Sequence, residues 1–269
     1  GDHDSSFADV AAEIAQQTMS RNFRNFDPSE ARVLLLEGGD RLLASYPERL
    51  SASASAQLER MGVAVRTGSR VAEIDGYGVA IGGERVESRT VIWAAGVRAS
   101  GLAGAFEDAL DSGGRVRVTP RLTVPGREEV FVVGDLAAVE SDGEPVPGLA
   151  QAAMQGGAHA ARNIRRAVGG RPLERFCYRD KGQMATVGRS RGVALVGGRQ
   201  LTGFVAWALW SLVHLLFLVG FRNRLIVMLG WIFSYVTFQR GARVILDDRE
   251  STPRAALSPA LRGRSFDRG

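Results

Sequence analysis

The alternation of apolar and polar residues along this chain predicts an α/β protein. Short apolar runs, bounded by Gly and by polar residues, have the length and composition of strands. They lie at Arg32–Glu37, Val63–Arg66, Val71–Ile74, Val79–Ile81, Arg85–Val86, Thr90–Ala94, Arg115–Val118, Glu129–Val133, Phe176–Lys181, Gln183–Val187 and Val193–Val196. Gly76, Gly78, Gly82 and Gly83 mark the turns of a small antiparallel excursion within this series.

Three stretches have the end signals and composition of helices: Phe7–Met19, Pro47–Met61 and Leu149–Val168. Pro47 lies near the start of the second helix, and Gly62 follows its end, which are the preferred positions of these residues. The third helix is rich in Ala and Gly. Such a helix can pack closely against a neighbouring element or a bound ligand.

Two uncharged apolar runs follow near the C-terminus. Gly203–Phe221 has 19 residues, close to the roughly 20 that cross a bilayer. Leu225–Phe238 has 14 and is too short to cross easily. Trp and Tyr side chains and four flanking arginines without an acid predict contact of residues 203–243 with an anionic membrane. Spanning and interfacial helices both remain open, and a buried core helix is the alternative.

The charge balance divides the 269-residue chain. Residues 1–161 carry 15 Arg and 23 acids, whereas residues 162–199 carry 10 basic and 2 acidic residues. A basic C-terminal half suits nucleic acid or an anionic membrane. Because aromatic residues do not interleave with the basic ones, nucleic-acid binding is not expected. A single cysteine, Cys177, excludes an internal disulfide, and three scattered histidines predict no metal site.

Gly134 and Asp135 follow the apolar run Val130–Val133 and are the first candidate site. Gly134 has no Cβ, so the backbone there can approach a ligand closely. We expect Asp135 at the carboxyl end of a parallel strand, where open α/β sheets bind ligands, as an acceptor for sugar or ribitol hydroxyls. An ordinary Gly-Asp turn is the alternative.

Glu37 ends the strand Arg32–Glu37 and is a candidate for nucleotide binding. An acid at this place accepts hydrogen bonds from ribose hydroxyls and repels a 2′-phosphate, which favours NADH over NADPH. The run Ala94-Ala95-Gly96 offers a second close backbone approach beside a nicotinamide nucleotide, or a plain turn. No Gly-x-Gly-x-x-Gly motif occurs in the chain.

Gln151 and Gln155 lie four residues apart, on one face of the helix Leu149–Val168. They can present two amides to a pocket, or lie in solvent. Lys181 is the only lysine of the chain. It can donate to an anionic ligand, or pair with Asp180.

In this order, the motifs resemble the type II NADH:quinone oxidoreductases, which are single-chain flavoproteins. The resemblance runs from about Phe7 to Leu246 and includes the Ala-Gln-x-Ala-x-Gln pattern at 150–155. It implies the glutathione-reductase-like fold of two dinucleotide-binding domains, here without its first strand and Gly-rich loop. It divides the chain into an NADH-binding domain (1–110), part of an FAD-binding domain (111–200), membrane-anchoring helices (201–245) and a disordered tail (246–269).

The resemblance also implies roles for the candidate residues. Asp135, with Gly134 and Ala150, would contact FAD; Glu37, Ala95 and Gly96 would contact NADH. Gln151 and Gln155 would line a quinone pocket beside the flavin, with Lys181 near both. The implied activity passes a hydride from NADH to FAD and two electrons to a membrane quinone, without proton pumping, at the cytoplasmic face of the cell membrane. A homodimer is left open.

The missing Gly-rich segment predicts weak FAD binding and weak or no activity for this chain alone. Two alternatives are kept. One is a non-catalytic, membrane-anchored nucleotide-binding module. The other is a different FAD-dependent reductase of the ferredoxin or disulfide type.

Overall fold

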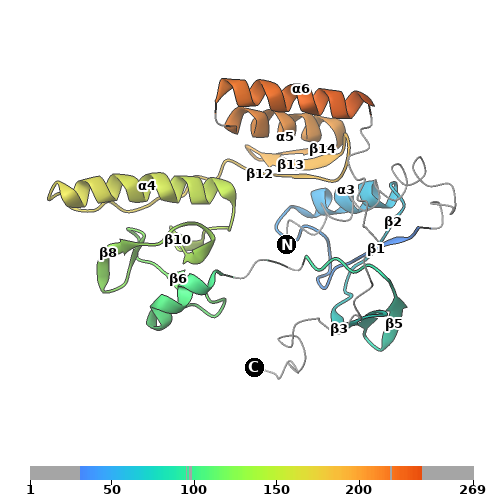
Figure 1. The fold of residues 1–269 in the computed structure, drawn as a ribbon, viewed down its shortest axis with the longest axis horizontal. Helices are drawn as coiled ribbons and strands as arrows, with labels where there is room; N and C mark the ends of the chain where they lie inside the picture. Colours follow the sequence, from blue (N-terminus) through green and yellow to red (C-terminus); the bar gives the residue numbers. More distant parts are fainter. Residues whose placement is uncertain (1–30, 95, 97–98, 219, 238–269) are drawn as a thin grey trace, which may run out of the picture.

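A computed structural model describes residues 31–94, 96, 99–218 and 220–237 (Figure 1). The predicted helix Phe7–Met19 and the tail 246–269 lie outside these residues. The α-helices are α3 (Glu48–Glu59), α4 (Ala150–Val168), α5 (Gly203–Phe217) and α6 (Phe221–Thr237), and the 3₁₀ helices are η3 (Gly101–Ala109) and η4 (Gly134–Leu136).

The strands are short and form small sheets. They are β1 (Val33–Leu36), β2 (Val63–Arg66), β3 (Val71–Asp75), β4 (Gly78–Ile81), β5 (Glu84–Glu87), β6 (Val116–Arg117), β7 (Thr123–Val124), β8 (Arg127–Phe131), β9 (Ala137–Ala138), β10 (Glu140–Ser141), β11 (Glu144–Pro145), β12 (Gln183–Thr186), β13 (Gly192–Val196) and β14 (Arg199–Thr202). The sequence predicted β1 to β5 to within a few residues and missed the short strands β7, β9, β10 and β11 as well as β14. The α/β class is confirmed.

Helix α3 lies at the centre of the first core. Leu50, Ala54 and Leu58 recur at a spacing of four, and all three are fully buried. On one side they pack on the parallel pair β1–β2, and on the other on Val187 and Val193. The side chain of Gln57 donates to the carbonyl of Gly192 at 3.3 Å, so the helix is bonded to a strand 135 residues away.

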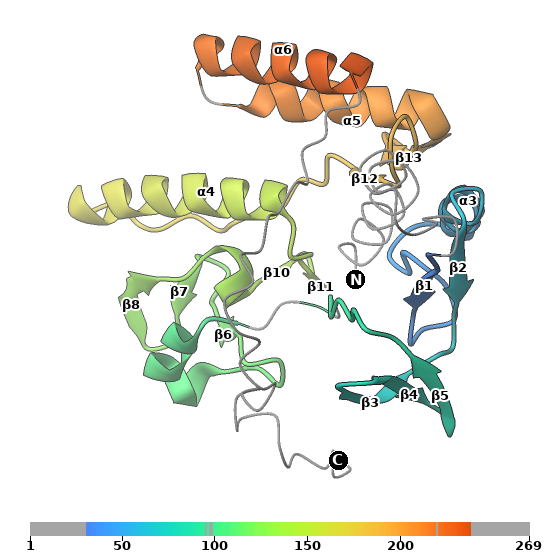
Figure 2. The ribbon, with the colours of Figure 1, turned by 45° about the vertical axis from the view of Figure 1, so that its right-hand side comes forward.

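The antiparallel sheet β12–β13–β14 lies between two helices. Helix α3 packs on it from below in Figure 1, and α5 from above. Figure 2 shows the same order from another direction, with β3–β4–β5 projecting beyond β1–β2. A second core, around Val116, Val124 and Val132, holds together η3, the parallel pair β6–β9 and the antiparallel pair β7–β8.

Three strand predictions are wrong. Residues 90–94 form no strand, and Ile92 and Trp93 are exposed. No described strand pairs with this run. Because a β-strand is stabilised by hydrogen bonds to a neighbouring strand, the run is irregular. Phe176–Lys181 is also no strand, because side chains bind its backbone, as shown below. Finally, β8 pairs with β7 in antiparallel orientation, so Asp135 does not follow a parallel strand.

The predicted apolar span Gly203–Phe221 is not one helix. The backbone becomes extended at Leu218, and Gly220 has φ +84°, so the run breaks and α6 begins at Phe221. Arg224 Nε donates to the Leu218 carbonyl at 2.8 Å and closes the turn. The result is a hairpin of α5 and α6, and no helix among the described residues is long and apolar enough to cross a bilayer.

Candidate functional site

Gly134 and Asp135 form η4, which packs against the start of α4 and creates what we call the η4–α4 junction. Gly134 has φ +70°, a left-handed conformation that favours glycine. The exposed carboxylate of Asp135 has no hydrogen bond or ion pair within the described residues. No side chain caps α4, and no acceptor within the described residues binds the N–H groups of Ala150 and Gln151. An acceptor and two helix-terminal donors therefore lie at this junction.

The junction fits the polar part of a flavin dinucleotide. Asp135 offers an acceptor for hydroxyl groups, and the free N–H groups at the positive end of α4 suit a carbonyl or phosphate oxygen. Two buried oxygens of the chain after α4, Tyr178 Oη and Gln183 Oε1, have no partner within the described residues. Burial raises the pKa of Tyr178, so its hydroxyl remains protonated and can donate. The residues present agree with the cofactor that the sequence predicts.

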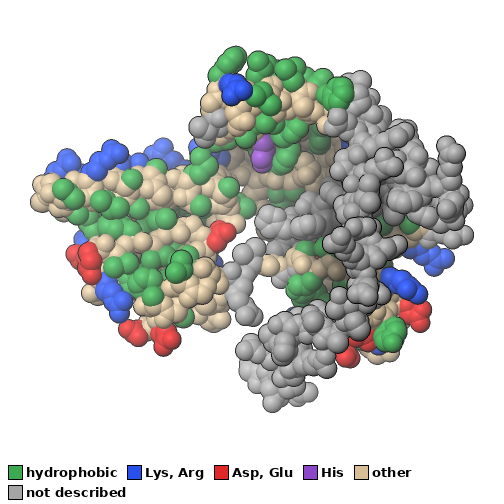
Figure 3. All heavy atoms as spheres, in the orientation of Figure 1, with side chains coloured by type: hydrophobic (Ala, Val, Ile, Leu, Met, Phe, Trp, Pro, Cys, Tyr) green, Lys and Arg blue, Asp and Glu red, His purple; other side chains and the backbone are tan. Residues whose placement is uncertain are grey.

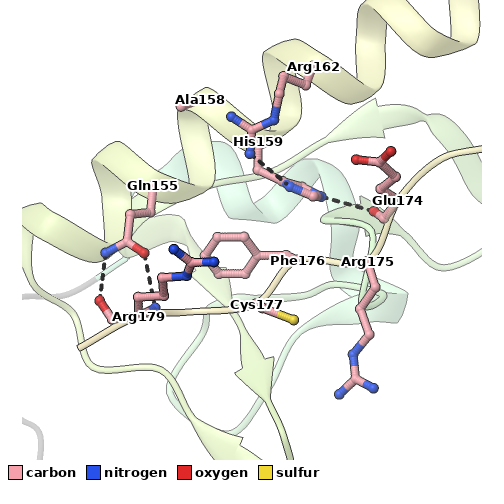
Figure 4. Close-up of a pocket in the computed structure, with 9 residues that line it drawn as sticks. All are labelled: Gln155, Ala158, His159, Arg162, Glu174, Arg175, Phe176, Cys177 and Arg179. Atoms are coloured by element: carbon pink, nitrogen blue, oxygen red, sulfur yellow. Dashed lines mark hydrogen bonds between the residues drawn. The ribbon is translucent and has the colours of Figure 1, made fainter.

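Gln151 and Gln155 are bonded to backbone, and neither extends freely into solvent. Gln151 Nε2 donates to the Gly182 carbonyl at 2.8 Å, and the Lys181 N–H donates to Gln151 Oε1 at 3.1 Å. Gln155 repeats the pattern with Arg179, whose carbonyl and N–H lie 2.9 and 3.0 Å from the amide (Figure 4). Each amide thus bonds the backbone as a neighbouring strand would. We call the segment that these amides hold, Glu174–Gly182, the docked segment.

Sequence reasoning missed two further members of this series. His159 Nε2 donates to the Glu174 carbonyl at 2.9 Å. Asn163 is fully buried; its amide donates to the same carbonyl at 2.9 Å and accepts from the Glu174 N–H at 2.9 Å. Gln151, Gln155, His159 and Asn163 recur every four residues, so they form one stripe along α4, which we call the polar stripe. The spacing of four was the available signal.

Lys181 is exposed at the end of the docked segment, and its Nζ lies 6.0 Å from the ring centre of Phe217 in α5. The pair with Asp180, one of the two alternatives from the sequence, is absent among the described residues. Instead, Asp180 Oδ1 accepts from the Gly182 N–H at 2.8 Å. Lys181 is therefore held at the place where α4, the docked segment and the α5–α6 hairpin meet, with a charge that no described carboxylate neutralises.

Glu37 lies directly after β1, at the edge of the pair β1–β2. Its Oε1 accepts from the Gly39 N–H at 2.6 Å, and its other carboxylate oxygen has no partner within the described residues. Gly96 has φ +107° and donates its N–H to the Ala94 carbonyl at 2.9 Å, so the predicted turn exists. Ala95 lies outside the described residues. No hydrogen bond or ion pair joins Glu37 or Gly96 to the η4–α4 junction within the described residues.

The comparisons with known proteins agree with the resemblance found in the sequence. The profile of the pyridine nucleotide-disulphide oxidoreductase family matches residues 7–157. Two type II NADH:quinone oxidoreductases of Mycobacterium tuberculosis, Ndh and NdhA, are each 38% identical to this chain over 88% and 92% of it. These matches cover 53% and 57% of the two relatives, so the chain spans a little over half of their length.

Solved structures show the same fold. NDH2 from Plasmodium falciparum in complex with NADH superposes with a TM-score of 0.74 at 14% identity, over 84% of this chain and 62% of that one. The sulfide:quinone oxidoreductase of Aquifex aeolicus gives 0.63 at 13% identity, over 82% of this chain and 56% of that one. At these identities, the likeness concerns the fold.

Proposed function

Because the chain belongs to the pyridine nucleotide-disulphide oxidoreductase family, we propose that it contributes the FAD- and NADH-contacting parts of a type II NADH:quinone oxidoreductase. The observation that carries the proposal is the η4–α4 junction, with its unpaired Asp135 carboxylate and two free helix N–H groups. The redox chemistry, uptake of a hydride and release of two electrons, would come from the bound flavin. The chain would bind and orient the flavin and the nicotinamide nucleotide, and would exclude water from them.

Asp135 accepts hydrogen bonds from the hydroxyl groups of the flavin nucleotide, and Gly134 leaves room for its approach. Ala150 and Gln151 donate their N–H groups at the positive end of α4. On the nicotinamide side, Glu37 keeps one carboxylate oxygen for a ribose hydroxyl and repels a 2′-phosphate. Ala95 and Gly96 provide the close backbone approach. The proposed domains, 1–110 for NADH and 111–200 for FAD, follow from these roles.

The quinone side would lie around Lys181. The amides of Gln151 and Gln155 are hydrogen-bonded to backbone. They would therefore help a quinone to bind by holding the docked segment in place, and not by donating to the quinone directly. Lys181 then offers the positive charge of the site. Its neighbour Phe217 belongs to α5, so a quinone that reaches Lys181 passes beside the apolar hairpin.

The protein would associate with the membrane at its cytoplasmic face; the exposed apolar side chains of the hairpin support the association itself (Figure 3). They include Phe204, Val205, Leu212, Leu216, Phe217, Phe221, Ile226, Leu229, Ile232 and Phe233, all at least half exposed. Such a surface suits the acyl–headgroup boundary of a bilayer. Arg222 and Arg224, between the two apolar runs, suit anionic headgroups.

The test is a titration of the purified, detergent-solubilised chain with FAD, followed by absorbance, before and after addition of NADH. Asp135→Asn should weaken FAD binding about tenfold, since it removes the charge from a charge-assisted hydrogen bond. Asp108→Asn, an exposed acid outside the junction, should leave it unchanged. Equal FAD affinity of both variants and the parent chain would refute the assignment of Asp135.

The same titration separates the alternatives. NADH binding without any flavin uptake identifies a non-catalytic nucleotide-binding module. A flavin that NADH bleaches, but that only ferredoxin or a disulfide reoxidises, identifies the other reductase class. Bleaching followed by reoxidation with a soluble quinone supports the proposed activity. Glu37→Gln should narrow the preference for NADH over NADPH, measured by calorimetry.

A further inference from the structure

A pocket of about 470 Å³ lies between α4 and the docked segment (Figure 4), away from the η4–α4 junction along the helix. Its lining combines three arginines, Arg162, Arg175 and Arg179, with a single acid, Glu174. That acid is already neutralised, because Arg166 lies 2.7 Å from its carboxylate. We propose that this pocket binds a phosphate-type oxyanion, either free or in a lipid headgroup.

Two of the three guanidinium groups are available to a ligand. Arg175 pairs with Asp142 at 3.4 Å on the surface. Arg162 and Arg179 have no carboxylate partner within the described residues; Arg162 makes one 3.4 Å contact with His159 Nδ1. Since a guanidinium can only donate, His159 Nδ1 is the acceptor of this contact, and Arg162 keeps its other N–H donors. Two planar guanidinium groups with free donors match an oxyanion.

The walls of the pocket are fixed before any ligand arrives. Gln155 bonds the backbone of Arg179, and His159 and Asn163 bond that of Glu174. In the docked segment, the alternate residues Arg175, Cys177 and Arg179 are exposed, whereas Phe176 between them is buried and lies edge-on to His159. A rigid frame that carries unpaired charges reduces the entropy lost on binding.

Cys177 provides a reporter, because it is the only cysteine of the chain, is exposed and lines the pocket. The full chain in detergent is treated with iodoacetamide, and alkylation is followed by intact mass. Inorganic phosphate at twice its dissociation constant leaves about one third of the sites open, so alkylation should slow about threefold. Sodium chloride at the same ionic strength should not reproduce the effect, because screening alone is not site-specific.

Arg162→Gln and Arg179→Gln should each remove the protection. Arg165→Gln is the matched control: it makes the same charge change on α4, outside the pocket lining. Protection by phosphatidic acid added to the detergent micelles, but not by free phosphate or by added phosphatidylcholine, assigns the site to a lipid headgroup. Protection by free phosphate assigns it to a soluble anion.

An alkylation rate that no phosphate source changes, or a protection that survives in both pocket variants, overturns the proposal. Circular dichroism of each variant establishes that it is folded. The experiment needs neither flavin nor NADH, so its outcome is independent of the function proposed above.

Discussion

The polar stripe of α4 makes a prediction that can be tested at single backbone positions. Gln155→Leu removes one donor and one acceptor, whose partners are the carbonyl and N–H of Arg179 at 2.9 and 3.0 Å. Each hydrogen bond contributes a net 0.5–1.5 kcal/mol, so the pair contributes about 1–2 kcal/mol at this partly exposed site. Opening of the docked segment at Arg179 should become about 5- to 30-fold more frequent.

Amide hydrogen exchange measures this opening directly. In Gln155→Leu, the Arg179 N–H should exchange faster by that factor, because it loses its only acceptor within the described residues. In Gln155→Glu, the acceptor remains while the donor to the Arg179 carbonyl is lost, so exchange should rise less. Gln151→Leu should instead accelerate the Lys181 N–H. Each variant is the control of the other.

Unchanged exchange at Arg179 in Gln155→Leu, with the variant folded, would refute the reasoning. It would mean that the glutamines do not hold the docked segment, and that their amides are free for a ligand. A uniform acceleration across the whole chain would likewise contradict a local role, since it reports a loss of global stability.

Three other predictions follow from single residues. Asn163→Leu leaves the Glu174 N–H without an acceptor and the Glu174 carbonyl with His159 alone, so it should lower the free energy of unfolding by about 1–3 kcal/mol, measured with urea. Gly134→Ala should lower the free energy of unfolding by about 1–2 kcal/mol, because a residue with a Cβ disfavours the φ of +70°. The added Cβ itself has room, since it would lie 3.6 Å from the Cβ of Ala153. The Arg115 N–H, followed by the Arg115 side chain, lowers the pKa of Asp111, so this carboxylate stabilises the fold above the ordinary aspartate pKa and loses that contribution in acid. Asp111→Asn should therefore destabilise the chain at neutral pH, by an amount that shrinks as urea unfolding is repeated at falling pH.

The sequence predicted α3, α4 and the first five strands well because their patterns are local. In α3, Leu50, Ala54 and Leu58 carry the period of a buried helix face, and capping signals enclose them. The errors arose where a partner decides the structure. Thr90–Ala94 has strand composition but no described neighbour to pair with, and Phe176–Lys181 pairs with side chains of a helix.

The candidate site was predicted in part. Gly134, Asp135, Gln151 and Gln155 lie around the start of α4, whereas their roles toward FAD and a quinone stay predictions. The hydrogen bonds of the two glutamine amides to the backbone of Arg179, Lys181 and Gly182 could not be foreseen, because they join residues 24 to 31 positions apart. The apolar runs near the C-terminus were correctly identified as helical. The length of the first run suggested one helix long enough to cross a bilayer. Gly220 breaks that helix, but as an uncharged residue it does not interrupt the apolar pattern in the sequence.

The buried position of α3 has a consequence for synthesis of the chain. Leu50, Ala54 and Leu58 are covered partly by Val187 and Val193, which a ribosome adds more than 120 residues later. At 5–20 residues per second, roughly 6–25 s pass before these residues have been made. During that interval one face of α3 is exposed to water and to other nascent chains. The helix is therefore a candidate binding site for chaperones during translation, and a fragment that ends before β12 should aggregate.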